Sequence, residues 1–219
     1  MNVAAHRNTL PGNRTLTANT LRRSTAIALV WIAGSLASFA QPNQPPATPT
    51  VGSVMEGQLK IVEGELVPAA EAMPEEKYSF APVGGEFTGV RTFALEMKHV
   101  ATANFVFYSA ILGQDPPPGV NVSGAANGPE DIQSKAQIVK YLKDSFALGH
   151  QALATLTTSN ELTPVANAPI PSMNTRLALA SFSLAHASDH YGQAAEYLRQ
   201  NGIIPPASQG QQPANPPRK

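Results

Sequence analysis

Two histidines toward the C-terminal end of the sequence have a spacing that suits metal binding. His186 and His190 are four residues apart and lie in the run SLAHASDHYGQAAEYLRQNGIIPP. On a helix, this spacing puts both imidazoles on one face, about 40° apart around the axis. Two imidazoles on one face can chelate a single divalent ion. Histidine pairs with this spacing also arise by chance, so the pair alone leaves a purely structural role open.

A third histidine, His99, changes the balance between these two interpretations. It lies within an apolar run, VRTFALEMKHVATANFVFYSAILG, at residues 90–113. Burying an imidazole costs free energy unless its nitrogens have partners, and a metal ion is one such partner. If the two runs form neighbouring helices, His99 can meet His186 and His190 at one point. Three neutral imidazoles leave an ion with its full charge and with open positions for water, which is typical of catalytic sites. The alternative is a hydrogen-bonded core histidine.

Two further polar residues, Asp189 and Gln193, are candidates for supporting roles, whereas a fourth histidine of the domain is placed outside the site. His150 comes near the end of another apolar pattern, beside Gly149, and is interpreted as a residue at the end of a helix bundle. Asp189 can accept a hydrogen bond from a ligating imidazole, or it is a surface carboxylate. Gln193 faces the same side as the histidine pair and can orient bound water, or it makes a polar contact within the bundle. We therefore take Asp189 and Gln193 as candidates for assisting catalysis.

The composition limits how a metal site can be built. The chain of 219 residues has 15 basic and 15 acidic side chains and no cysteine. Without cysteine, disulfides, thiolate zinc sites, iron–sulfur clusters and cysteine catalysis are excluded. A net charge of zero gives no reason to expect nucleic-acid binding. With thiolates excluded, the well-spaced ligands that this sequence offers for a transition metal are its histidines.

The first 40 residues have the pattern of an export signal. Four arginines and no acidic residue precede or border a short apolar run, TAIALVWIAGSLASF, and small residues follow up to Ala40. The run is shorter than the roughly 20 apolar residues of a membrane span. We expect residues 1–40 to be a cleaved signal peptide, with a periplasmic or extracellular location and no stable membrane insertion afterwards. Cleavage after Ala40 would change the net charge from 0 to −4.

The remainder of the chain predicts one helical domain between proline-rich ends. Residues 41–51 and 205–219 are rich in proline and are expected to be a disordered linker and a disordered tail. Residues 52–204 hold four segments with helical apolar periodicity, which start near Ser53, Thr88 or Thr92, Gly128 and Ser172. The predicted buried stripes are Met55, Leu59, Val62, Leu66, Ala70 and Met73 in the first segment, Leu95, His99, Ala103, Val106 and Ala110 in the second, and Ile132, Ala136, Val139, Phe146 and His150 in the third. No segment alternates with a period of two, so strands are not expected. Four helices of this length predict an all-α four-helix bundle.

These residues together resemble the DinB-like (DinB/YfiT) superfamily of metal-dependent enzymes. Three stretches carry the resemblance, in the family's order: AAEAMPEEKYSFAP at 69–82, the run at 90–113, and HASDHYGQAAEYLRQNGIIPP at 186–206. The resemblance covers nearly the whole domain. It implies a four-helix bundle with an unusual helix order, often dimeric, and a divalent ion such as zinc or nickel bound by His99, His186 and His190. Two positions depart from the family: Tyr191 stands where many members have arginine, and Pro68 lies within the first expected helix.

The resemblance implies an enzyme acting on a small molecule that the sequence does not identify. Because low-molecular-weight thiols are mainly cytosolic, export favours activation of water, and therefore a hydrolase. The first alternative is a thiol-dependent S-transferase or isomerase of the same superfamily. The second is a non-catalytic exported bundle that binds metal, and the third is a bundle whose histidines are core residues.

Overall fold

Four α-helices make up the domain in the computed structural model of the chain, which describes residues 48–86, 88–120 and 126–210. They are α1 (Val51–Ala72), α2 (Phe93–Leu112), α3 (Lys135–Ala154) and α4 (Arg176–Gln200), with short 3-10 turns η1 (Glu75–Lys77) and η2 (Pro206–Ser208). Over these residues the structure contains no strand, and the nearest feature is a single antiparallel bridge between Pro164 and Thr175. The prediction of an all-α four-helix fold is therefore confirmed.

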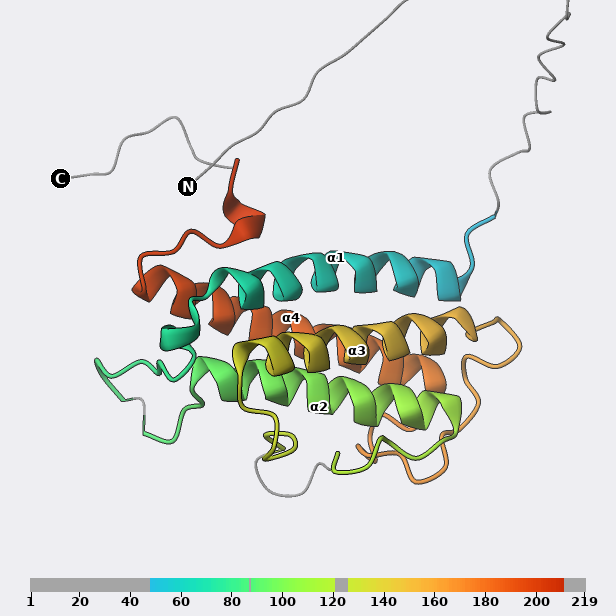
Figure 1. Ribbon diagram of the computed structural model, residues 1–219. Helices are drawn as coiled ribbons and strands as arrows, with labels where there is room; N and C mark the ends of the chain where they lie inside the picture. The colour runs from blue at the N-terminus through green and yellow to red at the C-terminus, as the bar shows by residue number, and fades with distance from the viewer. Residues whose placement is uncertain (1–47, 87, 121–125, 211–219) are drawn as a thin grey trace, which may run out of the picture. The chain divides into compact units, whose positions relative to one another are not determined.

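The helices pack in a ring whose order differs from their order in the sequence. Both α1 and α2 pack against α3 and α4, so that α1 and α2 occupy opposite corners of the bundle. Figure 1 shows that α1 and α4 run in one direction and that α2 and α3 run in the other. Contacts between helix ends agree with these directions, because Lys135 at the start of α3 donates to the carbonyl of Met73 after the end of α1, at 2.7 Å. The arrangement places α2 and α4 side by side and antiparallel.

Each helix begins at a hydroxyl side chain that caps its first turn. The caps are Thr50 for α1, Thr92 for α2, Ser134 for α3 and Thr175 for α4. These side chains accept hydrogen bonds from backbone N–H groups that have no partner within the helix. Two predicted starts were wrong by several residues: α3 begins after Ser134 rather than near Gly128, and α4 begins after Thr175 rather than near Ser172.

The reason for the late start of α3 is visible in the residues that precede it. Gly128 has a left-handed backbone (φ 75°), which an α-helix does not contain. Ser134 and Gln137 form a reciprocal capping box, in which the Gln137 side chain accepts from the Ser134 N–H at 3.0 Å. The acidic residues and the proline after Gly128 therefore belong to a turn and not to the first turn of the helix.

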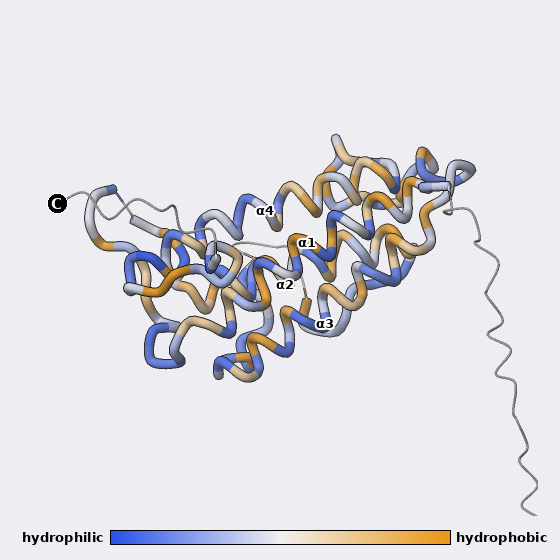
Figure 2. Tube along the Cα trace, turned by 90° about the horizontal axis from the view of Figure 1, so that it is seen from above, coloured by the Kyte–Doolittle hydropathy of each residue, from blue (hydrophilic) through white to orange (hydrophobic). Residues whose placement is uncertain are grey.

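The core is formed by apolar residues from all four helices, which alternate with polar residues along each helix (Figure 2). The predicted α1 stripe is buried throughout, from Met55 to Met73. In α2, 15 of 20 residues are buried, and the predicted stripe through His99 is in fact its less buried side. The predicted α3 stripe was also displaced, because Ala136 is exposed and Ile138 and Leu142 lie in the core instead.

The chain after α4 returns to the bundle before it leaves the described region. Pro205, at the start of the stretch expected to be a disordered tail, is buried, and η2 packs against α1. The expected signal peptide at 1–40, with His6, and residues 211–219 lie outside the described residues. None of the helices described is both long and apolar enough to cross a membrane.

Candidate metal centre

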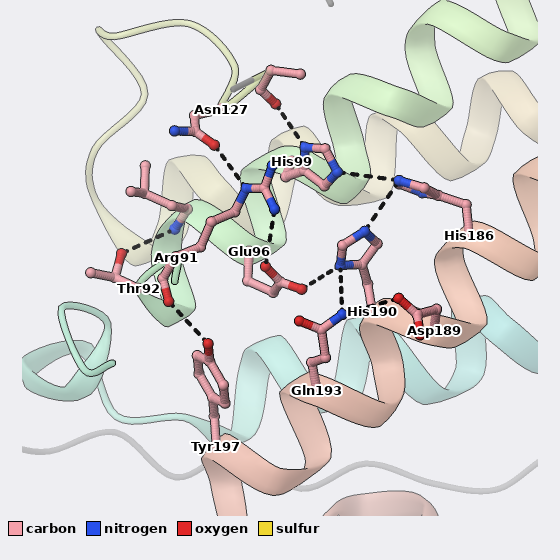
Figure 3. A network of polar contacts seen from close by, with 12 residues as sticks. Arg91, Thr92, Glu96, His99, Asn127, His186, Asp189, His190, Gln193 and Tyr197 are labelled. Carbon is pink, nitrogen blue, oxygen red and sulfur yellow. Dashed lines mark hydrogen bonds and ion pairs between the residues drawn. The ribbon is translucent and has the colours of Figure 1, made fainter. Parts of the chain in front are cut away.

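Three imidazoles from two helices converge between α2 and α4 (Figure 3). Nε2 of His186 lies 3.2 Å from Nε2 of His99 and 3.1 Å from Nε2 of His190. The three ligand atoms lie within 4.8 Å of one another. His99 comes from the second turn of α2, whereas His186 and His190 come from successive turns of α4. The antiparallel packing of these two helices brings the three rings to one point.

The positions of the ring protons indicate that a cation can bind where the three rings meet. Nδ1 of His99 donates to the carbonyl of Ala126 at 3.1 Å, and Nδ1 of His190 donates to the carboxylate of Glu96. A neutral imidazole carries one proton, so Nε2 of each of these rings presents a lone pair. A single proton on Nε2 of His186 cannot satisfy both neighbours, whereas one cation at the centre can bind all three nitrogens.

The spacing of the nitrogens also suits a metal ion. Ligand bonds of 2.0–2.1 Å in a tetrahedral site put neighbouring ligand atoms about 3.3–3.4 Å apart. The two separations of 3.1 and 3.2 Å are close to this edge length. Imidazole nitrogen is a ligand that suits zinc, nickel, copper and iron. The donor set and its geometry therefore fit a divalent transition-metal ion.

The surroundings keep two of the rings in the form that binds metal. Burial, together with the two neighbouring imidazoles and the Arg91 guanidinium, lowers the pKa of His186 to about 3. Burial and the nearby Arg91 guanidinium also lower the pKa of His99 below its usual value. Both rings are therefore neutral at neutral pH, which is the state in which imidazole nitrogen coordinates a metal.

An aromatic pair borders the centre on the side of His186. The ring of Phe107 lies at 90° to that of His186, with centroids 5.7 Å apart, and Phe182 lies 6.0 Å from His186. Nδ1 of His186 is buried and has no hydrogen-bond partner among the described residues. His99 and His186 are half-buried while His190 is buried, so the centre can be reached at its outer edge. One wall of the site is thus apolar, and the site is partly open.

Comparison with known families agrees with this geometry. The sequence profile of the DinB superfamily matches residues 58–194, which include all three histidines. The chain belongs to the DinB superfamily. No curated protein sequence matches it significantly. Family membership and the three convergent imidazoles together are compatible with a metal-binding enzyme of this superfamily.

The other predicted site residues take different positions. Asp189 is exposed, and its Oδ2 accepts from the side-chain amide of Gln193 at 3.1 Å. The nitrogen of this amide also lies 3.5 Å from Nδ1 of His190, so Gln193 flanks that ring on the side of Glu96 and not at the point where the Nε2 atoms meet. His150 lies on the opposite flank of the bundle, where its ring nitrogens contact Glu56 and Glu63 of α1. It is not part of the cluster.

Sequence reasoning missed the carboxylate that contacts a histidine of the cluster. Glu96 lies on α2, one turn before His99, and only 1% of its surface is exposed. Its second oxygen lies 4.0 Å from the guanidinium of Arg91. A charged residue inside an otherwise apolar run was the available signal, because a buried carboxylate needs a charged or hydrogen-bonding partner.

Proposed function

We propose that this DinB superfamily protein is a hydrolase that depends on a divalent metal ion, zinc or nickel, held by His99, His186 and His190. The observation that carries the proposal is the convergence of three Nε2 atoms with separations of 3.1 and 3.2 Å. Three neutral ligands leave the charge of a divalent ion uncompensated, which favours catalytic use over a structural one. When bound, the ion supplies Lewis acidity that makes water a nucleophile near neutral pH.

The residues around the cluster have simple roles in this proposal. The three imidazoles bind through Nε2, and the contact of His99 with the Ala126 carbonyl keeps that ring oriented. Phe107 and Phe182 exclude water from the side of His186 and can pack against an apolar part of a small-molecule substrate. Gln193, which lies beside Nδ1 of His190, can help to hold that ring in place.

Among the described residues, neither carboxylate near the cluster is placed to act as a general base at the centre. Glu96 is turned toward Nδ1 of His190 and thus away from the side on which the Nε2 atoms meet. Asp189 is exposed and engaged by Gln193. A bound ion would therefore have to activate water without help from a carboxylate of the described residues, which distinguishes the proposed site from hydrolases that rely on a carboxylate base.

Hydrolysis of a panel of simple esters and amides, with and without a chelator, tests this function. We expect zinc- or nickel-loaded protein to turn over at least one class of substrate, and chelation to abolish that turnover. The His186→Ala variant should be inactive, whereas His150→Ala leaves the cluster intact and should retain the activity. Turnover that survives chelation, or that is equal in His186→Ala, would refute the proposal.

Thiol conjugation in the same assay separates the hydrolase from the transferase alternative. Metal-dependent activity that requires an added low-molecular-weight thiol would replace hydrolysis by thiol transfer at the same centre. Metal binding without turnover of any substrate would leave a non-catalytic metal-binding bundle.

A further inference from the structure

The three histidines of the cluster differ in what their second ring nitrogen contacts. Nδ1 of His99 donates to a neutral backbone carbonyl, and Nδ1 of His186 has no partner among the described residues. Nδ1 of His190 alone contacts a carboxylate, that of Glu96. A carboxylate partner fixes the tautomer of an imidazole and makes its other nitrogen a stronger donor to a metal. The three nitrogens that meet at the centre are therefore not equivalent.

The position of Glu96 needs a physical explanation, because burying a carboxylate is unfavourable without strong partners. Its side chain is 2% exposed, one oxygen contacts His190, and the other lies 4.0 Å from Arg91. An apolar residue at this position would leave Nδ1 of His190 without a hydrogen-bond acceptor. The buried position of Glu96 is therefore explained by its contact with one ring of the cluster, that of His190.

Arg91 is itself held in place by residues from two other parts of the chain. Its Nε donates to Oδ1 of Asn127 at 2.9 Å, and its backbone carbonyl accepts from the hydroxyl of Tyr197 at 3.0 Å. Figure 3 shows the resulting sequence of contacts, from Asn127 through Arg91 and Glu96 to His190. Glu96 is thus held between Arg91 and His190. A carboxylate can align a ring only if it is itself held in place.

We infer that Glu96 is a positioning residue: it holds His190 as the Nδ1–H tautomer, turns its Nε2 toward the metal point, and raises the metal affinity of the cluster. The inference rests on the metal site of the proposed function but not on hydrolysis. Because Glu96 does not itself bind the ion, the three ligands stay neutral, and Glu96 affects the ion only through the basicity of His190. Glu96 acts through His190 and does not face the substrate.

Two substitutions separate the charge of Glu96 from its shape. Glu96→Gln keeps the size of the side chain and an oxygen that can accept, and Glu96→Ala removes the contact altogether. In the full chain, we expect zinc affinity, measured by competition with a chelator, to fall about 10- to 100-fold in Glu96→Gln, with the ion-to-protein ratio unchanged at saturation. Glu63→Gln is a matched control, since it removes a carboxylate from His150 outside the cluster and should leave zinc affinity unchanged.

A second measurement does not need the metal. Histidine labelled with ¹⁵N reports the tautomer of each ring in metal-free protein, and His190 should be Nδ1–H in the wild type. In Glu96→Ala, a substantial Nε2–H population should appear, whereas a merely structural role for Glu96 would lower thermal stability without changing the tautomer. Zinc affinity within twofold of the wild type in Glu96→Gln, with an unchanged His190 tautomer in Glu96→Ala, would overturn the inference.

The two measurements, zinc affinity and the tautomer of His190, test this inference separately from the proposed function. If the wild type binds no zinc, the proposed function fails, and the tautomer in metal-free protein still decides whether Glu96 controls His190. If the wild type binds zinc and neither variant changes affinity or tautomer, the metal site stands and the inference about Glu96 fails.

Discussion

Histidines of this protein behave in opposite ways because their neighbours differ. His186 lies among other imidazoles and aromatic rings, and its pKa is lowered to about 3. Burial alone would also lower the pKa of His150, but its hydrogen bonds to Glu56 and Glu63 outweigh burial and raise the pKa. The first environment favours a neutral ring that binds a cation, and the second favours an imidazolium that bridges two carboxylates.

The His150 contacts predict a pH-dependent contribution to stability. Because the folded pKa lies above the unfolded value of about 6.5, the stabilisation is fully present below that value and is lost as the pH rises through the folded pKa. His150→Gln should therefore lower the free energy of unfolding more at about pH 6 than at about pH 9, by about 1 kcal/mol for this partly exposed pair. Urea denaturation across this range measures the difference.

Glu71→Gln provides the control for this pH dependence. It removes an ion pair between the same two helices, from Glu71 to Lys143 at 2.6 Å, in which no histidine takes part. The change that Glu71→Gln causes in the free energy of unfolding should be the same from about pH 6 to about pH 9. A His150→Gln effect that is constant with pH would contradict the assigned role of the imidazolium.

At the residue scale, the sequence predicted the cluster but not its supporting contacts. The spacing of His186 and His190 determines that they share a helix face, so this part was accessible from sequence. The contact between Glu96 and His190 joins residues 94 positions apart, and it depends on the rotation of α2 against α4. A helical pattern does not specify that rotation, and the nearby Asp189 was the carboxylate that local spacing suggested.

The helices pack closely at particular glycines, which gives a test at the element scale. A Cβ at Gly149 of α3 would lie 2.7 Å from Cε2 of Tyr108, whose ring is fully buried, and 3.0 Å from Leu59. We expect Gly149→Ala to destabilise the protein by about 1–3 kcal/mol through overpacking, despite the better helix propensity of alanine. Gly57 of α1 has open space around it. Gly57→Ala should therefore stabilise by roughly 0.5–1 kcal/mol.

Denaturant unfolding of the two variants measures both effects. Opposite signs are expected for the same chemical change on two helices of one bundle. Equal changes for Gly149→Ala and Gly57→Ala would contradict the close contact between α2 and α3.

The turn before α3 connects the fold to the metal centre. Gly128 has φ 75°, and a Cβ there would lie 2.9 Å from Oγ1 of Thr102. Of the two residues before it, Ala126 accepts from His99 of the centre, and Asn127 accepts from Arg91, which lies beside Glu96. Gly128→Ala should therefore displace this turn and lower zinc affinity as well as stability, the latter by about 1–3 kcal/mol.

Gly192→Ala is the matched control for this turn. Gly192 lies two residues from His190 on α4, and nothing lies within 4 Å of its missing Cβ. Zinc affinity measured by chelator competition should be unchanged in this variant. A Gly128→Ala protein with wild-type zinc affinity would show that the turn does not hold His99 in place.

The number of helices and most of the buried residues of α1 were predictable from periodicity. Which faces of α2 and α3 are buried was not. The α1 pattern has one apolar side, so its buried residues could be read directly. In α2, nearly every side is covered by a helix or a loop. The stripe with His99 therefore did not show which side of α2 faces the core. Burial on all sides removes the contrast from which a helical pattern infers orientation.

At the scale of the whole molecule, the ring order of the helices makes the site possible. Because α1 and α2 occupy opposite corners, α2 contacts α4 along its length, and the two histidine-bearing helices are neighbours. The four-helix class was predictable from the sequence. This order was not predictable from periodicity, since each helix pattern is compatible with several partners; it was implied by the resemblance to the DinB superfamily.

The zinc content of untagged protein decides whether His99, His186 and His190 form a metal site. After loading and removal of free ions, we predict close to one zinc per wild-type chain, and almost none in His99→Ala or His186→Ala. The His150→Ala variant, whose altered histidine lies outside the cluster, should retain one. Excess zinc should also stabilise the wild type against unfolding, by about 2.7 kcal/mol at a free concentration one hundred times the dissociation constant. A wild-type chain that retains no zinc or nickel, and that zinc does not stabilise, would contradict the account.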